Sequence, residues 1–331
     1  SLPAVDTGDG LREQRNRRPT IQVSVPGAPD PSAMQPRTRT VEDVIPATVE
    51  TQGSGAWARI VGVDGEFQRD DDLGEIDEDM WMVQGGVDFL VSENEDSRLI
   101  AGVSLHYLES DTDVSTLDFG DVASLESEGW GVSGSLTWYN QAGAYVDGVI
   151  SGTWYETDIG DEGAALGSLA SDNEAFAWAV SVEGGMRYEF KPNYYWVPQA
   201  QLIYTSVDVD RFTDPFGADV NEADSDSLIG RLGVAFEYLN RTTGEGGEVH
   251  RMQGYGIFNL LYEFMDSGGA EVSGFEFDDD NEDFWGEFGA GLTYSFNEQW
   301  SIYGEGSYRT AWEDFGDSQA IQGSLGVRYN W

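Results

Sequence analysis

The sequence predicts an all-β fold: a twelve-stranded antiparallel transmembrane β-barrel of the bacterial outer membrane, with an N-terminal linker or plug segment. Three observations predict this fold. All 42 aromatic residues lie after residue 53, apolar and polar residues alternate along twelve segments, and the connections between those segments alternate between short and long. No continuous apolar run of about 20 residues is present, but a barrel strand needs only about 9–11 residues with alternate positions apolar.

Residues 1–53 are predicted to form the linker or pore plug, and residues 54–331 the barrel domain. The first segment holds seven of the ten prolines and no aromatic residue, so it cannot bury the apolar area needed to offset the entropy of ordering. Thr40–Asp43 could cap a short helix, but Pro46 would interrupt it. An extended or kinked plug therefore fits the sequence as well as a helix does.

Alternation of side chains identifies the strands of the barrel domain. Near its end, Leu325, Val327 and Tyr329 share one face, whereas Ser324 and Arg328 share the other, which is a period of two. The same pattern recurs throughout the domain. The twelve predicted strands span residues 55–68, 79–91, 98–111, 126–140, 143–157, 173–190, 193–210, 225–240, 250–264, 282–296, 299–312 and 319–331.

The connection lengths predict the orientation of the barrel. Short connections such as 141–142 and 191–192 alternate with long ones such as 112–125, 158–172 and 264–281. Outer-membrane barrels have short turns on the periplasmic side and long loops outside the cell. Because the number of strands is even, both barrel ends are predicted to be periplasmic and the long acidic loops extracellular.

The two faces of the predicted strands differ in chemistry. One face carries large apolar and aromatic residues, and the other carries charged residues interspersed with Gly, Ala and Ser. A soluble barrel would bury the apolar face, and lipocalin-like barrels usually have about 8 strands and a shorter chain. We therefore expect the apolar face to contact lipid and the polar face to line a hydrated lumen. The candidate girdle residues at strand ends are Trp138, Tyr139, Trp154, Trp300 and Trp331.

Composition excludes several classes of function. The chain carries 17 Lys+Arg against 61 Asp+Glu, a net charge of −44, so we expect no nucleic-acid partner because phosphate binding requires basic groups. Cys is absent, and the two histidines, His106 and His250, lie in no recognisable motif. A hydrolase would need a nucleophile or an activated water beside His or paired carboxylates. The sequence therefore does not predict an enzyme.

Acidic runs raise the question of a metal site. Asp70–Asp72 and Asp278–Asp283 offer the oxygen ligands that Ca²⁺ and Mg²⁺ prefer. Neither run has EF-hand spacing, and repeated acids more often form a solvated surface. We therefore predict neither a metal nor a cofactor, although Ca²⁺ binding by these loops remains an alternative.

Six strings within the predicted strands carry a family resemblance. They are Gly55–Arg59, Val83–Asp88, Gly143–Gly148, Pro198–Tyr204, Asp226–Gly233 and Asn259–Phe264. With them, residues 54–331 resemble the autotransporter translocator domain, the C-terminal barrel of the self-secreting proteins of type V secretion in Gram-negative bacteria. The last string, Ser324–Trp331, is similar to the insertion signal read by the outer-membrane assembly machinery; its signal residues are Ser324, Gly326, Tyr329 and Trp331.

The resemblance implies a barrel that inserts in the outer membrane and provides the pore for export or surface anchoring of an N-terminal passenger. It implies as partners outer-membrane lipid and lipopolysaccharide, the assembly machinery, and the chain's own passenger or linker. No Asn lies near the junction at residue 54, so self-cleavage at a junctional Asn is not expected. The alternative is a stand-alone porin-like channel with an N-terminal plug or periplasmic tether, whose acidic lumen would favour cations.

Polar residues on the inward face are the candidate pore-lining residues. In a translocator they would hydrate and position the threaded segment. The alternative for each one is a structural ladder of opposite charges between neighbouring strands. The candidates are Arg59, Glu183, Gln199, Gln201, Arg231, Asn259, Glu263, Glu287, Glu305 and Arg328.

Overall fold

The structure is a computed structural model that describes residues 54–68, 74–116, 120–161, 167–213, 219–221, 225–243, 249–265, 270–272, 275–277, 283–312, 316 and 318–331. The predicted segment 1–53 and the acidic run Asp70–Asp72 lie outside these residues, as do Asp278–Asp280 and the two residues that follow them. No helix in the described part is long and apolar enough to cross a membrane.

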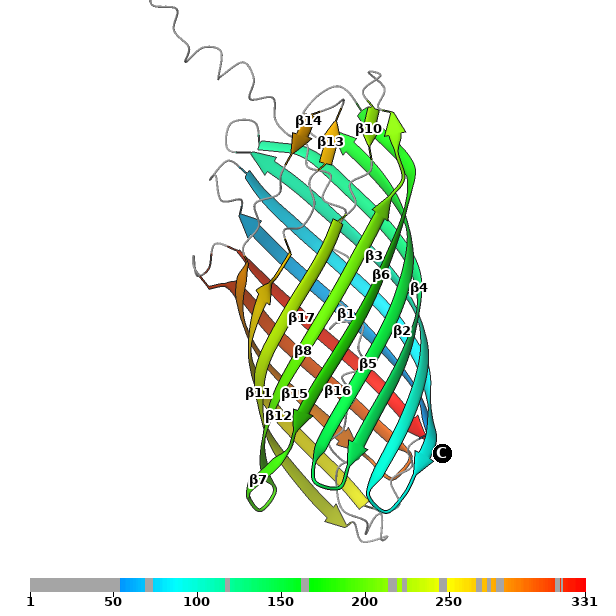
Figure 1. The fold of residues 1–331 in the computed structure, drawn as a ribbon, viewed down its shortest axis with the longest axis vertical. Coiled ribbons are helices and arrows are strands. Elements are labelled where there is room, and N and C mark those ends of the chain that lie inside the picture. Colours follow the sequence, from blue (N-terminus) through cyan, green and yellow to red (C-terminus); the bar gives the residue numbers. More distant parts are fainter. Residues whose placement is uncertain are drawn as a thin grey trace, which may run out of the picture.

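Twelve long antiparallel strands, counted over the described residues, close into one barrel (Figure 1). Each strand pairs with its neighbours in chain order, and the last pairs with the first from Gly55 opposite Asn330 to Glu66 opposite Gln319. The predicted fold class is confirmed. The strands are β1 Gly55–Gln68, β2 Gly74–Glu93, β3 Ser97–Thr116, β4 Gly120–Asn140, β5 Ala144–Asp161, β6 Gly167–Met186, β8 Tyr194–Val209, β11 Ser225–Thr243, β12 Val249–Glu263, β15 Phe284–Ser295, β16 Trp300–Ala311 and β17 Gln319–Asn330.

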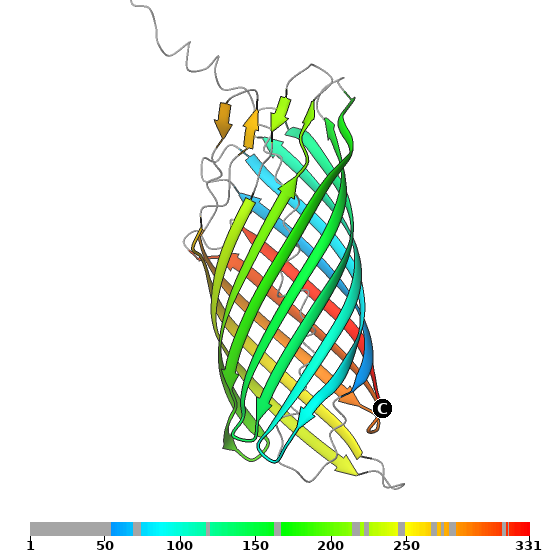
Figure 2. The ribbon, with the colours of Figure 1, turned by 45° about the vertical axis from the view of Figure 1, so that its right-hand side comes forward.

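Five short strands complete the sheet structure. β7 (Tyr188–Lys191) continues β6 after a break at Arg187 and pairs with β8. Two connections between barrel strands add a separate four-stranded sheet, in the order β14-β13-β10-β9, beyond one end of the barrel (Figure 2). The four strands are β9 Phe212–Thr213, β10 Asp219–Asn221, β13 Ala270–Val272 and β14 Phe275–Phe277.

The two ends of the barrel differ, and we name them the turn end and the loop end. The turn end holds the connections after β2, β4, β7, β11 and β15, together with Gly55 of β1 and Asn330 of β17. Local side chains shape its turns: Asn94 Oδ1 accepts the N–H groups of Asp96 and Ser97, each at 2.9 Å. Gly143 has φ +92°, a conformation that glycine adopts without strain.

Two long loops predicted from the sequence are mostly strand. The predicted loop 112–125 contains the end of β3 and the start of β4, and the predicted loop 158–172 contains the ends of β5 and β6. Outward acidic residues obscured the alternation in the sequence, but several inward positions remain apolar. Val114, Ala123 and Leu125 pack together on that face, so pairing continues to the loop end.

Large apolar side chains form an exposed band around the outside of the barrel. On β4 it runs from Trp130 to Trp138, and Leu105 on β3 and Leu232 on β11 are 66% and 67% exposed within it. Eight residues at about 3.3 Å each, on a strand tilted by about 35–45°, span roughly 20 Å, close to the apolar band of membrane barrels. The outer surface therefore has the chemistry of a lipid contact.

Aromatic residues border this band on both sides. Toward the loop end, Trp81, Tyr107 and Trp130 follow one another on β2, β3 and β4, with Tyr107 and Trp130 4.7 Å apart between ring centroids. Toward the turn end, Trp300 lies 4.8 Å from Tyr329. Four predicted girdle residues face outward. The prediction for Tyr139 is wrong, because this residue lies on the inner face and is 5% exposed. Its strand position, next to the outward Trp138, places it inside.

Beyond the loop-end aromatic residues, the outer face is acidic. Successive strands place carboxylates directly opposite one another, in the row Asp64, Asp79, Asp111, Glu126 and Asp158. No basic residue shares this outer zone in the described strands. The fifteen acidic residues of the zone are Asp64, Glu66, Glu75, Asp77, Asp79, Glu109, Asp111, Asp113, Glu126, Glu128, Glu156, Asp158, Glu174, Asp208 and Asp226.

Candidate functional site: the barrel lumen

The inner face of the wall is the candidate functional site. The structure places all ten candidate pore-lining residues on this face. A pleated strand turns alternate residues to opposite sides, so the odd or even position of a residue along its strand is enough to place it on the inner or outer face. What the sequence could not supply is which residues meet across the strands.

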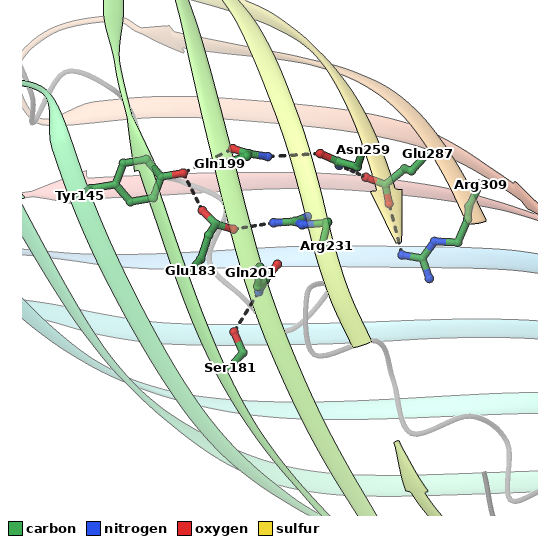
Figure 3. A network of polar contacts seen from close by, with 9 residues as sticks. All are labelled: Tyr145, Ser181, Glu183, Gln199, Gln201, Arg231, Asn259, Glu287 and Arg309. Atoms are coloured by element: carbon green, nitrogen blue, oxygen red, sulfur yellow. Dashed lines mark hydrogen bonds and ion pairs between the residues drawn. The ribbon is translucent and has the colours of Figure 1, made fainter. Parts of the chain in front are cut away.

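One network crosses most of the barrel (Figure 3). The Tyr145 hydroxyl on β5 donates to Glu183 Oε1 at 2.7 Å and lies 3.3 Å from Gln199 Oε1. Gln199 donates to Asn259 Oδ1 at 3.4 Å, and Asn259 donates to Glu287 Oε1 at 2.6 Å. Polar side chains of β5, β6, β8, β12 and β15 thus form one continuous chain.

Two ion pairs anchor this network. Arg231 Nη2 lies 2.5 Å from Glu183 Oε2, and Arg309 Nη2 lies 3.2 Å from Glu287 Oε2. The side chains of Arg231 and Glu183 are only 5% and 7% exposed. Removing one partner of a buried pair leaves an uncompensated charge and costs about 3–5 kcal/mol. Nearby, Gln201 donates to Ser181 Oγ at 2.9 Å.

A second group of contacts spans the closing strands. Arg59 Nε on β1 donates to Gln84 Oε1 at 2.9 Å, and Gln84 donates to Ser104 Oγ at 3.1 Å. At the seam between β17 and β1, Arg328 Nη1 lies 2.5 Å from Asp88 Oδ2 on β2. These contacts link β17, on one side of the closure, to β2 on the other, and join β1, β2 and β3 to one another.

The remaining two candidates are also held by the wall. Glu305 accepts a hydrogen bond from the Tyr255 hydroxyl and another from Ser324 Oγ at 3.3 Å. Glu263 lies nearer the loop end, where it accepts the Ser227 hydroxyl at 2.6 Å and the Leu228 N–H at 2.7 Å. Their carboxylates are therefore fixed in position by neighbouring strands.

Several inward polar residues were not among the candidates. Arg187 Nε lies 2.9 Å from Glu237 Oε2, and its guanidinium lies 3.4 Å from the centre of the Tyr195 ring. Asp147 accepts the Thr137 hydroxyl. Strand alternation places Arg187 and Glu237 on the inward face from the sequence alone, but it does not reveal that they meet across the strands.

Three inward tyrosines lie across glycines of the neighbouring strand. A Cβ on Gly185, Gly291 or Gly326 would fall within 3.0 Å of the Tyr145, Tyr255 or Tyr303 ring, respectively. In each pair the missing side chain leaves room for the ring. Two of these rings, those of Tyr145 and Tyr255, thereby reach a carboxylate on another strand.

The lumen is not polar along its whole length. Toward the loop end an apolar cluster is buried on that face, formed with others by Val61, Met82, Leu108 and Val207. The long strands extend beyond the outer apolar band toward the loop end. Inward side chains in that part of the barrel lie outside the level of the membrane, and they need not be polar to line a hydrated channel. The inner wall therefore has a polar part and an apolar part.

The lumen is also not strongly acidic, contrary to the expectation attached to the porin-like alternative. Charges of both signs lie on the inner face, nearly in balance among the described residues. The basic residues on this face include Arg59, Arg187, Arg231, Arg241, Arg251, Arg309 and Arg328, with Arg98 at the turn end; the acidic residues include Glu78, Asp88, Asp147, Glu183, Glu237, Glu263, Glu287 and Glu305, with Glu93 paired to Arg98 and Glu189 opposite Tyr195.

The two histidines are far apart and differ in surroundings. His106 lies on the inner face with Nε2 2.9 Å from Thr153 Oγ1, whereas His250 lies at the turn end beside Tyr294. In the described part of the chain, no group of three or more His, Asp or Glu residues could hold a metal ion.

The predicted assembly-signal residues occupy both faces of β17. Ser324 and Gly326 face inward, against Glu305 and the Tyr303 ring, respectively. Tyr329 faces outward and lies 6.3 Å from the Trp331 ring. The small signal residues thus lie on the inner face of this strand, and the aromatic signal residue Tyr329 lies on its outer face.

Comparison with known proteins agrees with the fold. Residues 56–307 match the family model for the Autotransporter beta-domain. The Adhesin BmaC autotransporter of Brucella suis biovar 1 (strain 1330) is 34% identical over 297 residues. That alignment covers 87% of this chain and 9% of the adhesin, so the chain spans only a small part of this relative.

Two solved structures share the architecture. The beta domain of the Bordetella autotransporter BrkA superposes with a TM-score of 0.64 at 22% identity, over 84% of this chain and 100% of that domain. The translocator domain of the autotransporter NalP from Neisseria meningitidis gives a TM-score of 0.68 at 15% identity, over 91% of this chain and 96% of that domain. At these identities the likeness concerns the fold.

The closed barrel, its apolar outer band and its polar inner face define a β-barrel of the outer-membrane type. The chain belongs to the Autotransporter beta-domain family. The resemblance found in the sequence is therefore confirmed, as is the function as an outer-membrane translocator barrel. A translocator barrel is not itself a catalytic domain.

Proposed function

We propose that the barrel provides the pore through which an N-terminal passenger is exported or anchored at the cell surface. The observation that carries this proposal is a closed wall whose inner face holds a continuous polar network at the level of the outer apolar band. The ten candidate residues would hydrate and position the threaded segment. Family membership favours this function over the porin-like channel.

The proposed orientation places the turn end in the periplasm and the loop end outside the cell. Short turns on the periplasmic side are the general rule for outer-membrane barrels. Residue 54 lies at the turn end, where the Trp331 N–H donates to the Ser54 carbonyl at 3.2 Å. Residues 1–53 would thus connect a passenger to the periplasmic mouth of the lumen.

The proposed partners follow from this placement. Outer-membrane lipid, including lipopolysaccharide, would contact the apolar band and its aromatic borders. The assembly machinery would read Ser324, Gly326, Tyr329 and Trp331 on the last strand, because that strand presents an open edge until the barrel closes. The passenger or linker would occupy the lumen.

A reporter export experiment tests the proposed function. A small protease-sensitive domain is fused before Ser1, the fusion is expressed with a secretion leader, and intact cells are treated with protease. We expect the reporter to be cleaved from outside while the barrel remains folded. A folded, membrane-inserted barrel whose reporter stays protected until the outer membrane is opened would contradict the proposal.

A further inference from the structure

The two faces of the barrel wall carry very different charge. The inner face carries arginines and carboxylates in similar numbers, whereas the outer zone near the loop end has fifteen carboxylates and no basic residue among the described strand positions. The fifteen carboxylates of the outer zone therefore supply more of the net charge of −44 than the lumen does, because basic and acidic residues nearly cancel on the inner face. The segment 1–53, with six Arg against seven acids, adds only −1 wherever it runs.

The inner charges are also mostly matched locally. Arg231, Arg309 and Arg328 each lie within 3.2 Å of a carboxylate oxygen, as does Arg187. Opposite charges this close cancel most of each other's field a few ångströms into the lumen. A permeating ion or peptide segment thus meets alternating small dipoles rather than a surface of one sign.

Salt decides whether the outer carboxylates act on the lumen. The Debye length is about 8 Å at 0.15 M salt and about 30 Å at 0.01 M. The wall, one sheet with side chains on both faces, is roughly 10 Å thick. Physiological salt therefore screens the outer charges from the lumen, and low salt does not.

We propose that this pore discriminates little between cations and anions at physiological salt and becomes cation-selective when the salt concentration is low. The same balance makes the lumen a conduit for polypeptide segments of either charge. Only the part of this inference that concerns threaded polypeptide segments rests on the proposed function. The selectivity itself follows from the charges of the wall.

The reversal potential of the full chain in a planar bilayer tests the proposal. Under a KCl gradient centred on physiological salt, we expect a cation-to-anion permeability ratio within about threefold of unity, because balanced lumen charges produce no sustained electrostatic barrier to either ion. Lowering both salt concentrations tenfold should raise the ratio. Strong cation selectivity at physiological salt, or no current above the protein-free bilayer, would overturn the proposal.

Variants separate the lumen from the outer surface. Arg328→Gln leaves Asp88 without its ion pair and should shift selectivity toward cations, whereas Arg328→Gln combined with Asp88→Asn should restore the original ratio. The double variant Asp111→Asn with Glu126→Gln, on the outer face, should leave the cation-to-anion permeability ratio unchanged at physiological salt. An outer variant that shifts selectivity as much as the lumen variant would contradict the account.

A folding control accompanies each variant. Only barrels that keep the compact, heat-modifiable form on gels are compared, and if Arg328→Gln does not fold, Arg309→Gln, alone and together with Glu287→Gln, replaces it. The two proposals fail separately. A pore with the expected selectivity that exports no reporter contradicts the proposed function alone, and a strongly selective pore that exports the reporter contradicts only this inference.

Discussion

At the scale of single residues, the lumen depends on buried charges that meet only across strands. Arg231 and Glu183 are 48 positions apart in the chain and 2.5 Å apart in the wall. Their own strands are not paired with each other, because β8 lies between β6 and β11. Each charge is acceptable inside the wall only because the other is there.

Replacing Arg231 with Met should therefore destabilise the barrel strongly. We expect a loss of about 3–5 kcal/mol in unfolding free energy, because Glu183 would remain buried without its partner. The double variant Arg231→Met with Glu183→Gln should recover most of the loss. Urea unfolding in detergent micelles measures both, and additive losses in the double variant would contradict the coupling.

The tyrosines that lie across glycines lead to a second residue-scale prediction. Gly291→Ala should displace the Tyr255 ring and its contact with Glu305, at a cost of about 1–3 kcal/mol from overpacking. Gly256→Ala is the matched control, because its new Cβ would meet no atom closer than 3.8 Å. Equal stabilities of the two variants in the same unfolding assay would show that the ring does not need the glycine.

At the scale of strands, the acidic rows near the loop end are a source of repulsion. Carboxylates directly opposite each other on neighbouring strands are destabilising. Asp79→Asn or Asp111→Asn should therefore stabilise the loop ends of β2 and β3, by about 0.2–1 kcal/mol each, and less at high salt. Hydrogen exchange of β2–β4 amides measures this. Faster exchange in the variants at low salt would contradict the interpretation.

The last strand carries the second prediction at this scale. Trp331→Asp should reduce the amount of folded barrel in the outer membrane while leaving synthesis unchanged, because a charged residue replaces an outward aromatic residue at the edge of the apolar band. Quantifying heat-modifiable barrel in outer-membrane fractions checks it. Trp312→Asp replaces another exposed aromatic residue, at the loop end just after β16, and serves as the comparison. Normal barrel levels in Trp331→Asp would remove the basis for the assembly-signal proposal.

The strands also indicate how far sequence alone can reach. Parity within a strand is local, so the inward face, including Arg59 and Asn259, was predictable. The partner of Arg231 was not, because pairing depends on the stagger of the whole barrel. Strand ends at Thr116 and Gly167 were missed because beyond the apolar band the outward residues are polar, and the alternation that marks a strand is weaker there.

At the scale of the whole molecule, the barrel separates three environments. Its outer band is apolar, its loop-end exterior is acidic, and its lumen combines balanced charges with an apolar region. The separation requires every strand to keep its register, because a shift of one residue would exchange the inward and outward faces. Closure between β1 and β17 fixes the register of the first and last strands together.

The medium on each side of the wall can be measured directly at two adjacent positions. The chain has no Cys, so Leu105→Cys and Ser104→Cys give single labels on opposite faces of β3. In vesicles with brominated acyl chains, a fluorophore at position 105 should be quenched strongly and one at 104 should not. A label at 104 quenched by lipid, with the label at 105 protected, would contradict the barrel orientation on which the translocation pathway depends.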